Sequence, residues 1–206
     1  MAKPEYQKQV FINCPFDQEF WPMMQAMVFA IHACGFIPHC ALEADDAGEE
    51  RAAKIMRIIE ECHLGIHDLS RKGADPDSYL SRFNMPYEMG LFQGAARYGR
   101  KKKIMLVMEA EKFDYRRFIS DISGRDISHH NNRPEKIISL IRDWLHTQRI
   151  YDKLSGGKKI CERYEEFLKD LPLILQEAEL DASETGPECR GSFINWSDAV
   201  TSWLKA

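Results

Sequence analysis

The sequence predicts an α/β protein built on a doubly wound parallel sheet of four or five strands, with a C-terminal helical extension. Three observations favour this fold class. Short apolar stretches alternate with segments of helical periodicity from residue 10 to residue 108, as is typical of parallel sheets, whose neighbouring strands need crossover connections. The stretch 104–108, IMLVM, is apolar throughout, as expected for a central strand buried on both faces. The chain of 206 residues is long enough for one sizeable domain.

The first half of the chain supplies the elements of a flavodoxin-like sheet. The predicted strands are residues 10–12, 36–42, 62–69 and 104–108, and the predicted helices are residues 17–34, about 49–61 and 84–98. Gly35 ends the first of these helices, and an isoleucine face gives the second its buried side. The stretch 70–83 is rich in Pro, Gly and Ser, and we expect a loop there that is long enough to form a lid or an active-site wall.

The third predicted helix carries the candidate catalytic carboxylate. Pro86 suits the first helical position, and Asn84 or Met85 then occupies the cap. Glu88 falls near the start of this helix, and Gly99 ends it. The basic run 100–103 follows at the negative end of the helix dipole, where we expect a solvated helix end.

Beyond residue 132 the pattern becomes helical. An amphipathic helix is predicted from Pro134 to about residue 148, and a second over 158–180, which Pro172 can kink. Trp196 and Trp203 mark an apolar stripe on a terminal helix. We therefore expect a Rossmann-like nucleotide- or nucleoside-binding domain over 1–132, and a helical extension over 133–206 that packs on it or on a second subunit of a homodimer.

Composition excludes some functions. The net charge of −4 gives no global attraction for nucleic acid or an anionic membrane. No apolar run approaches the roughly 20 residues that span a bilayer, and the N-terminal residues lack a signal-peptide core, so we expect a cytoplasmic protein. The six cysteines lack zinc-site spacing, and the adjacent His129 and His130 would point to opposite faces of a strand. We expect neither a metal nor a cofactor.

Polar residues gather where the predicted strands end, which is where ligands bind to doubly wound sheets. The candidate ligand-binding residues are Asn13, Pro15, Phe16, Asp17, Glu43, His67, Asn84 and Met85, and the candidate catalytic residues are Glu88 and Asp68.

Each candidate also has a structural interpretation. Glu88 can attack or stabilise an oxocarbenium-like anomeric carbon, or serve as a capping glutamate at the third helical position. Asp68 can bind ribose hydroxyls or position a base, or cap the following turn through Ser70. Asn84 and Asp17 can hold a ligand or cap their helices. His67 is either a packed histidine or an acid–base group.

Two segments resemble a known family. These are NMPYEMGLFQGAARYGRKKKIMLVM, residues 84–108, and VFINCPFDQEFWPMMQAMVFAI near the N-terminus. Together they resemble the nucleoside 2-deoxyribosyltransferases and the related bacterial TIR-like domains, over roughly residues 9–130. The resemblance implies that Glu88 is the nucleophilic glutamate. The family places a second carboxylate just ahead of it, where this chain has Arg82.

We therefore expect cleavage of an N-glycosidic bond in a nucleoside, nucleotide or NAD-like substrate. The TIR-like form would hydrolyse the nicotinamide bond of NAD, often as an effector in bacterial antiphage defence, whereas the transferase form would exchange bases on deoxyribose. The alternatives are a non-catalytic nucleotide-sensing module and a homo-oligomeric interaction domain.

Overall fold

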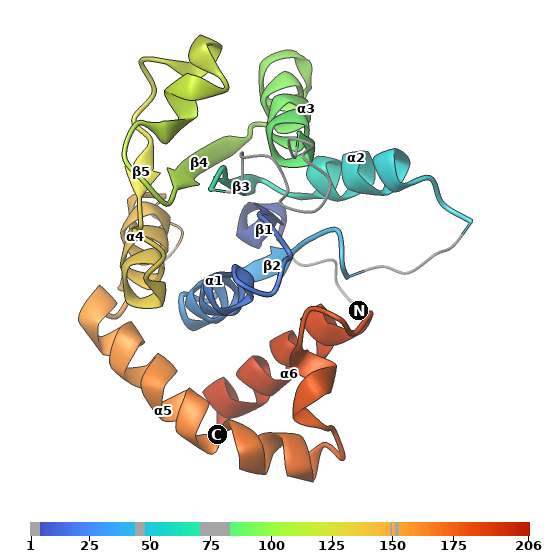
Figure 1. The fold of residues 1–206 in the computed structure, drawn as a ribbon, viewed down its shortest axis with the longest axis vertical. Helices are drawn as coiled ribbons and strands as arrows, with labels where there is room; N and C mark the ends of the chain where they lie inside the picture. The colour runs from blue at the N-terminus through green and yellow to red at the C-terminus, as the bar shows by residue number, and fades with distance from the viewer. Residues whose placement is uncertain (1–4, 44–47, 71–82, 149, 151–152) are drawn as a thin grey trace. The chain divides into compact units, whose positions relative to one another are not determined.

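The computed structural model describes residues 5–43, 48–70, 83–148, 150 and 153–206. Within them a five-stranded parallel sheet has the order β2-β1-β3-β4-β5 (Figure 1). The strands are β1 (Gln9–Asn13), β2 (Ile37–His39), β3 (Leu64–Asp68), β4 (Ile104–Glu109) and β5 (Ser128–His129). This is the flavodoxin-like strand order, so the predicted fold class is confirmed.

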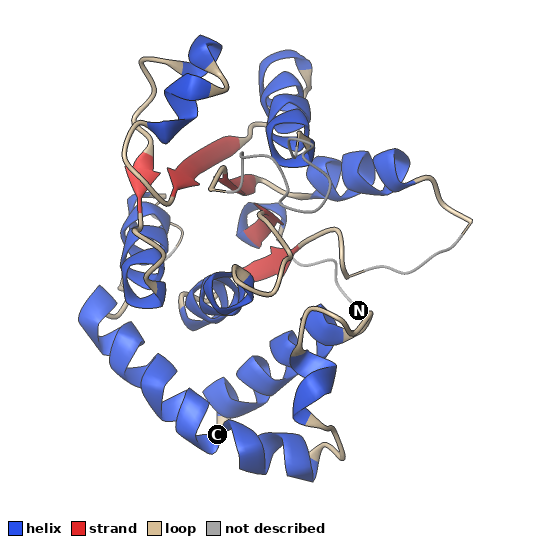
Figure 2. Cartoon of the chain, viewed as in Figure 1, coloured by secondary structure: helices blue, strands red, loops and turns tan. Residues whose placement is uncertain are grey.

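Helices connect and follow the strands, as Figure 2 shows in blue. They are α1 (Trp21–Ala33), α2 (Arg51–Glu61), α3 (Asn84–Tyr98), α4 (Pro134–Thr147), α5 (Gly157–Glu177) and α6 (Ser192–Lys205). Pro172 lies inside α5, as predicted. No helix of the described residues is both long and apolar enough to cross a membrane.

Two strands, β2 and β3, are shorter than predicted. β2 covers only Ile37–His39 of the predicted stretch 36–42. It contains Pro38, which cannot donate a ladder hydrogen bond, and accordingly β2 lies at the edge of the sheet. β3 begins at Leu64 because Cys62 still belongs to the preceding helix end, where its N–H bonds the carbonyl of Ile58.

The sheet register brings the strand ends together. Asn13 of β1 pairs with His67 of β3, and Asp68 of β3 pairs with Met108 of β4. Glu109, which the sequence analysis left outside the strand, is the last residue of β4 and pairs with His129. All residues of β1 and β3 are buried, as expected for strands in the sheet interior.

The chain divides into two compact units. The first comprises residues 1–15, 39–41 and 49–132, and the second comprises residues 16–38, 42–48 and 133–206. The predicted boundary between residues 132 and 133 is one border of this division. Residues 16–38, which include α1, group with the C-terminal helices.

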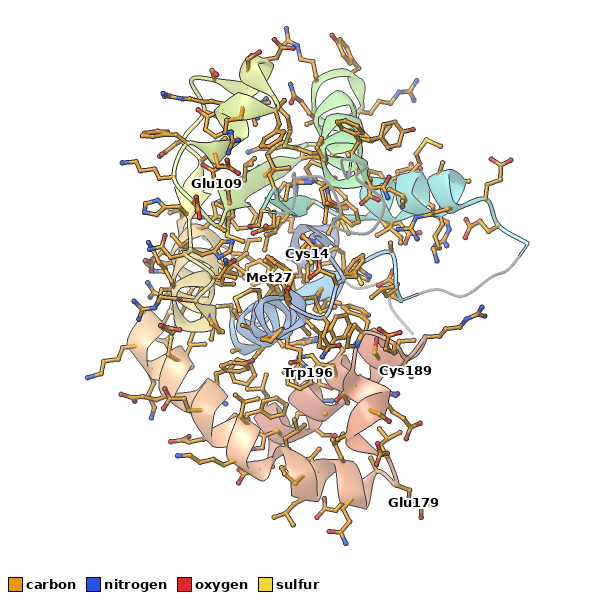
Figure 3. The ribbon with its side chains drawn as sticks, in the orientation of Figure 1. Cys14, Met27, Glu109, Glu179, Cys189 and Trp196 are labelled. Atoms are coloured by element: carbon orange, nitrogen blue, oxygen red, sulfur yellow. The ribbon has the colours of Figure 1, made fainter. Side chains whose placement is uncertain are left out.

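Within the second unit, the C-terminal helices pack on α1. The ring of Phe29 lies 5.0 Å from that of Tyr164 and 5.4 Å from that of Phe167, measured between centroids. Trp196, labelled in Figure 3, is 1% exposed, and its Nε1 donates to the carbonyl of Gln25 at 3.1 Å. Helix α1 is apolar nearly all round because it is covered on most of its sides.

Within the first unit, the basic run after α3 has two kinds of residue. Arg100, Lys101 and Lys102 are exposed, as expected of a solvated helix end. Lys103 differs, because its Nζ donates to the carbonyls of Ile59 and of Cys62 (2.6 Å) at the end of α2. Burial lowers the pKa of Lys103 to about 8.

Candidate functional site

Asn13 and His67 form the centre of the candidate site. They end neighbouring strands, and both are buried, at 2% and 0% exposure. Asn13 Nδ2 donates to the carbonyl of Met85 at 2.8 Å and lies 3.1 Å from Nδ1 of His67. The first turn of α3 is thereby attached to the carboxyl edge of the sheet.

The protonation of His67 follows from these contacts. A carbonyl can only accept, so the nitrogen of the Asn13 amide faces Met85, and Nδ1 of His67 accepts the second amide hydrogen. The ring hydrogen then lies on Nε2, which is buried and has no hydrogen-bond partner among the described residues. Burial, with a smaller contribution from the charge of Arg125, lowers the pKa of His67 to about 3. His67 is therefore a neutral, packed histidine.

Aromatic rings surround the imidazole. Phe92 lies 5.0 Å away at an interplanar angle of 65°, and Phe11 lies 5.9 Å away at 68°. Edge-to-face contact of this kind is a favourable aromatic geometry. A Cβ placed on Gly65 would come within 2.8 Å of Nε2 of His67, so the glycine leaves just enough room for the ring.

Helix α3 begins earlier than predicted. Phe83 is its N-cap residue, without a side-chain cap bond, and Asn84 is the first helical residue. The predicted cap at Asn84 or Met85 is therefore wrong, and Pro86 is the third helical residue instead of the first. The first four N–H groups of a helix have no partner within it, so proline fits anywhere in this turn and does not mark the start.

Glu88 is consequently the fifth helical residue, two positions beyond the predicted capping position. It is 6% exposed and shares a buried stripe with Met85, Met89 and Phe92. Met85, one turn before it, contacts Asn13 through its carbonyl, and Phe92, one turn after it, packs on His67. Glu88 thus lies along α3 between these two contacts.

The Glu88 carboxylate has no hydrogen bond to another described residue, and no cap bond is present at this helix start. Burial raises the pKa of its carboxyl, and the nearby positive charge of Arg51 partly opposes the shift. Most buried carboxylates are paired or hydrogen-bonded, because an uncompensated charge is costly to bury.

Asp68 has different surroundings, since successive strand residues point to opposite faces. One of its oxygens accepts from the N–H of Ser70 at 2.9 Å, which confirms the predicted turn cap. The other lies 2.9 Å from Nε2 of His130. The sequence analysis missed this partner, because it follows 62 residues later.

Ser70, His130 and Asp68 do not form a catalytic triad. Ser70 Oγ and Asp68 Oδ2 both approach the same ring nitrogen, Nε2. Nδ1 of His130 accepts from the N–H of Asn132 at 3.1 Å. In a triad the acid and the nucleophile bind different nitrogens of the imidazole.

Glu109 is a second carboxylate that the sequence analysis missed. Glu109, labelled in Figure 3, is 1% exposed, and its oxygens accept from the N–H groups of Phe113 (2.7 Å) and Tyr115 (2.8 Å). Phe113 has a φ of 68°, an unusual left-handed conformation for a bulky residue. Glu109 therefore holds the segment after β4 in place. The sequence feature that could have identified Glu109 is its position at the end of an apolar strand.

The remaining predicted residues are less involved with this centre. Pro15 is buried in the first unit, and Asn84 is exposed. Phe16, Asp17 and Glu43 belong to the second unit. Asp17 Oδ1 accepts from the N–H of Phe20 at 3.0 Å, just before α1, as in its predicted capping role.

The structure thus brings together Asn13, His67 and Met85, and Glu88 follows Met85 by about one turn on the buried face of α3. The predicted lid falls mainly on residues 71–82, which include Arg82 and lie outside the described residues. In the described part of the chain, no group of three or more His, Cys, Asp or Glu side chains could hold a metal ion. No protein-family model matches the chain, and neither does a curated protein.

Proposed function

We propose that this protein cleaves the N-glycosidic bond of a nucleoside, nucleotide or NAD-like substrate, with Glu88 as its catalytic carboxylate. The observation that carries the proposal is the buried Glu88 side chain, which has no hydrogen bond among the described residues and lies on α3 between Met85, whose carbonyl binds Asn13, and Phe92, which packs on His67. The strand-end location supports it, because flavodoxin-like sheets bind their ligands there.

The chemistry needs an ionised carboxylate next to the anomeric carbon. As the C1′–N bond breaks, its electron pair leaves with the base, and positive charge develops on the sugar. The Glu88 carboxylate either stabilises this charge or attacks C1′ to form an ester, which water or a second base then opens. In a buried site such a charge interaction is stronger than in water. Asn13 would hold the sugar.

Incubation with NAD and a panel of ribo- and deoxyribonucleosides tests the proposal, with released base detected by chromatography. We expect release by the wild-type protein and at least a 100-fold loss in Glu88→Gln, which keeps the size of the side chain but removes its charge. Glu61→Gln, at an exposed position on α2, is the matched control and should retain full activity. Retained activity in Glu88→Gln would rule Glu88 out as the catalytic residue.

A nucleotide-sensing role without catalysis is the second candidate. It is favoured by Asp68, the other predicted catalytic carboxylate, because both of its oxygens are already bonded within the protein. Tight binding of a nucleoside or NAD by the wild-type protein, with no base released, would select this role. Base release from NAD alone would instead support the TIR-like form of the activity, and with it a defence effector.

A further inference from the structure

We propose that Asn13 selects the ligand by accepting a hydrogen bond from a ribose hydroxyl, and that His67 is the positioning residue that fixes Asn13 as an acceptor. The inference rests on the proposed function, which places the sugar beside Glu88. It goes further by stating the direction of the hydrogen bond: the ribose hydroxyl donates and Asn13 accepts.

The direction follows from the way the amide is held. Both hydrogens of Asn13 Nδ2 have acceptors, the carbonyl of Met85 at 2.8 Å and Nδ1 of His67 at 3.1 Å. Rotating the amide by 180° would place its oxygen against the Met85 carbonyl, and two acceptors repel each other. Only Oδ1 is left to meet a ligand.

Asn13 Oδ1 is available for that contact. It has no hydrogen bond among the described residues. Two side-chain polar atoms of the described residues are both sealed from solvent and unbonded, Nε2 of His67 and Oγ of Ser192, and Asn13 Oδ1 is not one of them. Oδ1 is therefore an unused acceptor at the carboxyl end of β1, on a residue that is 2% exposed.

The surroundings of His67 keep its Nδ1 an acceptor. Phe11 and Phe92 face the ring edge-on, and Gly65 lies so close to Nε2 that an added Cβ would approach it within 2.8 Å. No carboxylate is bonded to Nε2 among the described residues, so nothing there stabilises a second ring proton. The hydrogen of Nε2 stays on the apolar side, and Nδ1 stays directed at Asn13.

The candidate site therefore presents hydrogen-bond acceptors to a ligand. Asn13 Oδ1 and the Glu88 carboxylate can both accept a hydrogen bond, and the hydroxyls of a ribose can donate one. A phosphate, which presents acceptor oxygens and negative charge, would be repelled from the same place. The ligand class is a nucleoside or nucleotide whose ribose hydroxyl donates at this edge and whose phosphate, where present, lies elsewhere.

Binding measurements separate this inference from catalysis. The Glu88→Gln protein, in which we expect turnover to be lost, is titrated with adenosine, guanosine, cytidine and uridine and with their 2′,3′-dideoxy counterparts. We expect at least about tenfold tighter binding of one ribonucleoside than of its dideoxy partner, as for one well-made hydrogen bond. Adding Asn13→Leu should abolish the preference. No binding of any ribonucleoside, or tighter binding of inorganic phosphate, would overturn the proposal.

Two substitutions at His67 distinguish positioning from packing. His67→Phe keeps a ring between Phe11 and Phe92 but removes the Nδ1 acceptor, so we expect a stable protein with a several-fold weaker preference for the hydroxyl. His67→Asn places an oxygen near the position of Nδ1, so it should retain the preference while losing stability. The opposite pattern would show that His67 only packs. A hydroxyl preference without base release would support this inference and contradict the proposed activity. Base release without a hydroxyl preference would support the proposed activity and contradict this inference.

Discussion

Oδ2 of Asp68 lies 2.9 Å from Nε2 of His130, and both side chains are completely buried. Because Nδ1 of His130 accepts from the N–H of Asn132, the ring hydrogen lies on Nε2 and is donated to Asp68. The pair joins the end of β3 to the residues that follow β5. With the bond from the Ser70 N–H, it also occupies both oxygens of Asp68.

Replacing Asp68 by Asn should therefore destabilise the fold. The amide oxygen can accept from either His130 or Ser70, but the amide nitrogen then faces the other donor, which is left without an acceptor. We expect the free energy of unfolding to fall by about 1–3 kcal/mol, the cost of a buried unsatisfied polar group. Urea denaturation measures it, with Asp126→Asn at an exposed position as the control. Equal stability of the two variants would argue for a ligand-binding role of Asp68.

Glu109 provides a second test of a structural carboxylate. In Glu109→Gln, the amide oxygen can still accept from the N–H of Phe113 or of Tyr115. The amide nitrogen then faces the other of these two N–H groups, which loses its acceptor. The left-handed conformation of Phe113 then loses support. We expect hydrogen exchange at these two amides to accelerate at least about tenfold, which corresponds to roughly 1.4 kcal/mol. The exposed Glu111→Gln should leave both rates unchanged.

Sequence periodicity predicted the parts of the molecule that depend on local pattern. The buried strands, the apolar helix faces and the placement of Asn13 and His67 at neighbouring strand ends follow from alternation and from the rule for parallel sheets. The start of α3 was misplaced because Pro86 is compatible with any position in the first turn. This error moved Glu88 from the fifth helical position to the third.

Long-range pairs lay beyond such reasoning. The bond between Asp68 and His130 depends on β5 lying next to β4, and a strand of two residues gives almost no sequence signal. The tautomer of His67 likewise depends on the carbonyl of Met85, which lies 72 residues from Asn13. Composition gives no information about which backbone group meets a side chain.

The buried state of His67 predicts a pH dependence of stability. Its pKa in the folded protein is about 3, against an ordinary value of 6.5. Between these values the unfolded chain binds more protons than the folded one, so stability is complete above about pH 6.5 and decreases as the pH falls toward 3. The slope attributable to His67 reaches about 1.4 kcal/mol per pH unit. His67→Phe should remove it, as measured by urea denaturation between pH 4 and 7, and an unchanged slope would contradict the neutral assignment.

The ionisation of Glu88 should change stability with pH in the direction opposite to that of His67. Burial raises the pKa of its carboxyl in the folded protein, so above the ordinary value the folded state keeps the proton longer than the unfolded chain does. The stability contributed by the protonated form is complete below about pH 4.5 and is lost as the pH rises through the raised value. Glu88→Gln cannot ionise and should therefore be at least as stable as the wild-type protein at pH 7.

The same titration governs the proposed reaction, because only the ionised carboxylate can attack or stabilise the sugar. Base release by the wild-type protein should increase with pH through the raised pKa, over the range in which its stability advantage from protonated Glu88 disappears. The difference in stability between the wild-type protein and Glu88→Gln excludes the contribution of His67, and it should therefore decrease with pH over the range in which the rate increases. A rate that is independent of pH above 4.5, together with a destabilised Glu88→Gln, would assign Glu88 to the fold and not to catalysis.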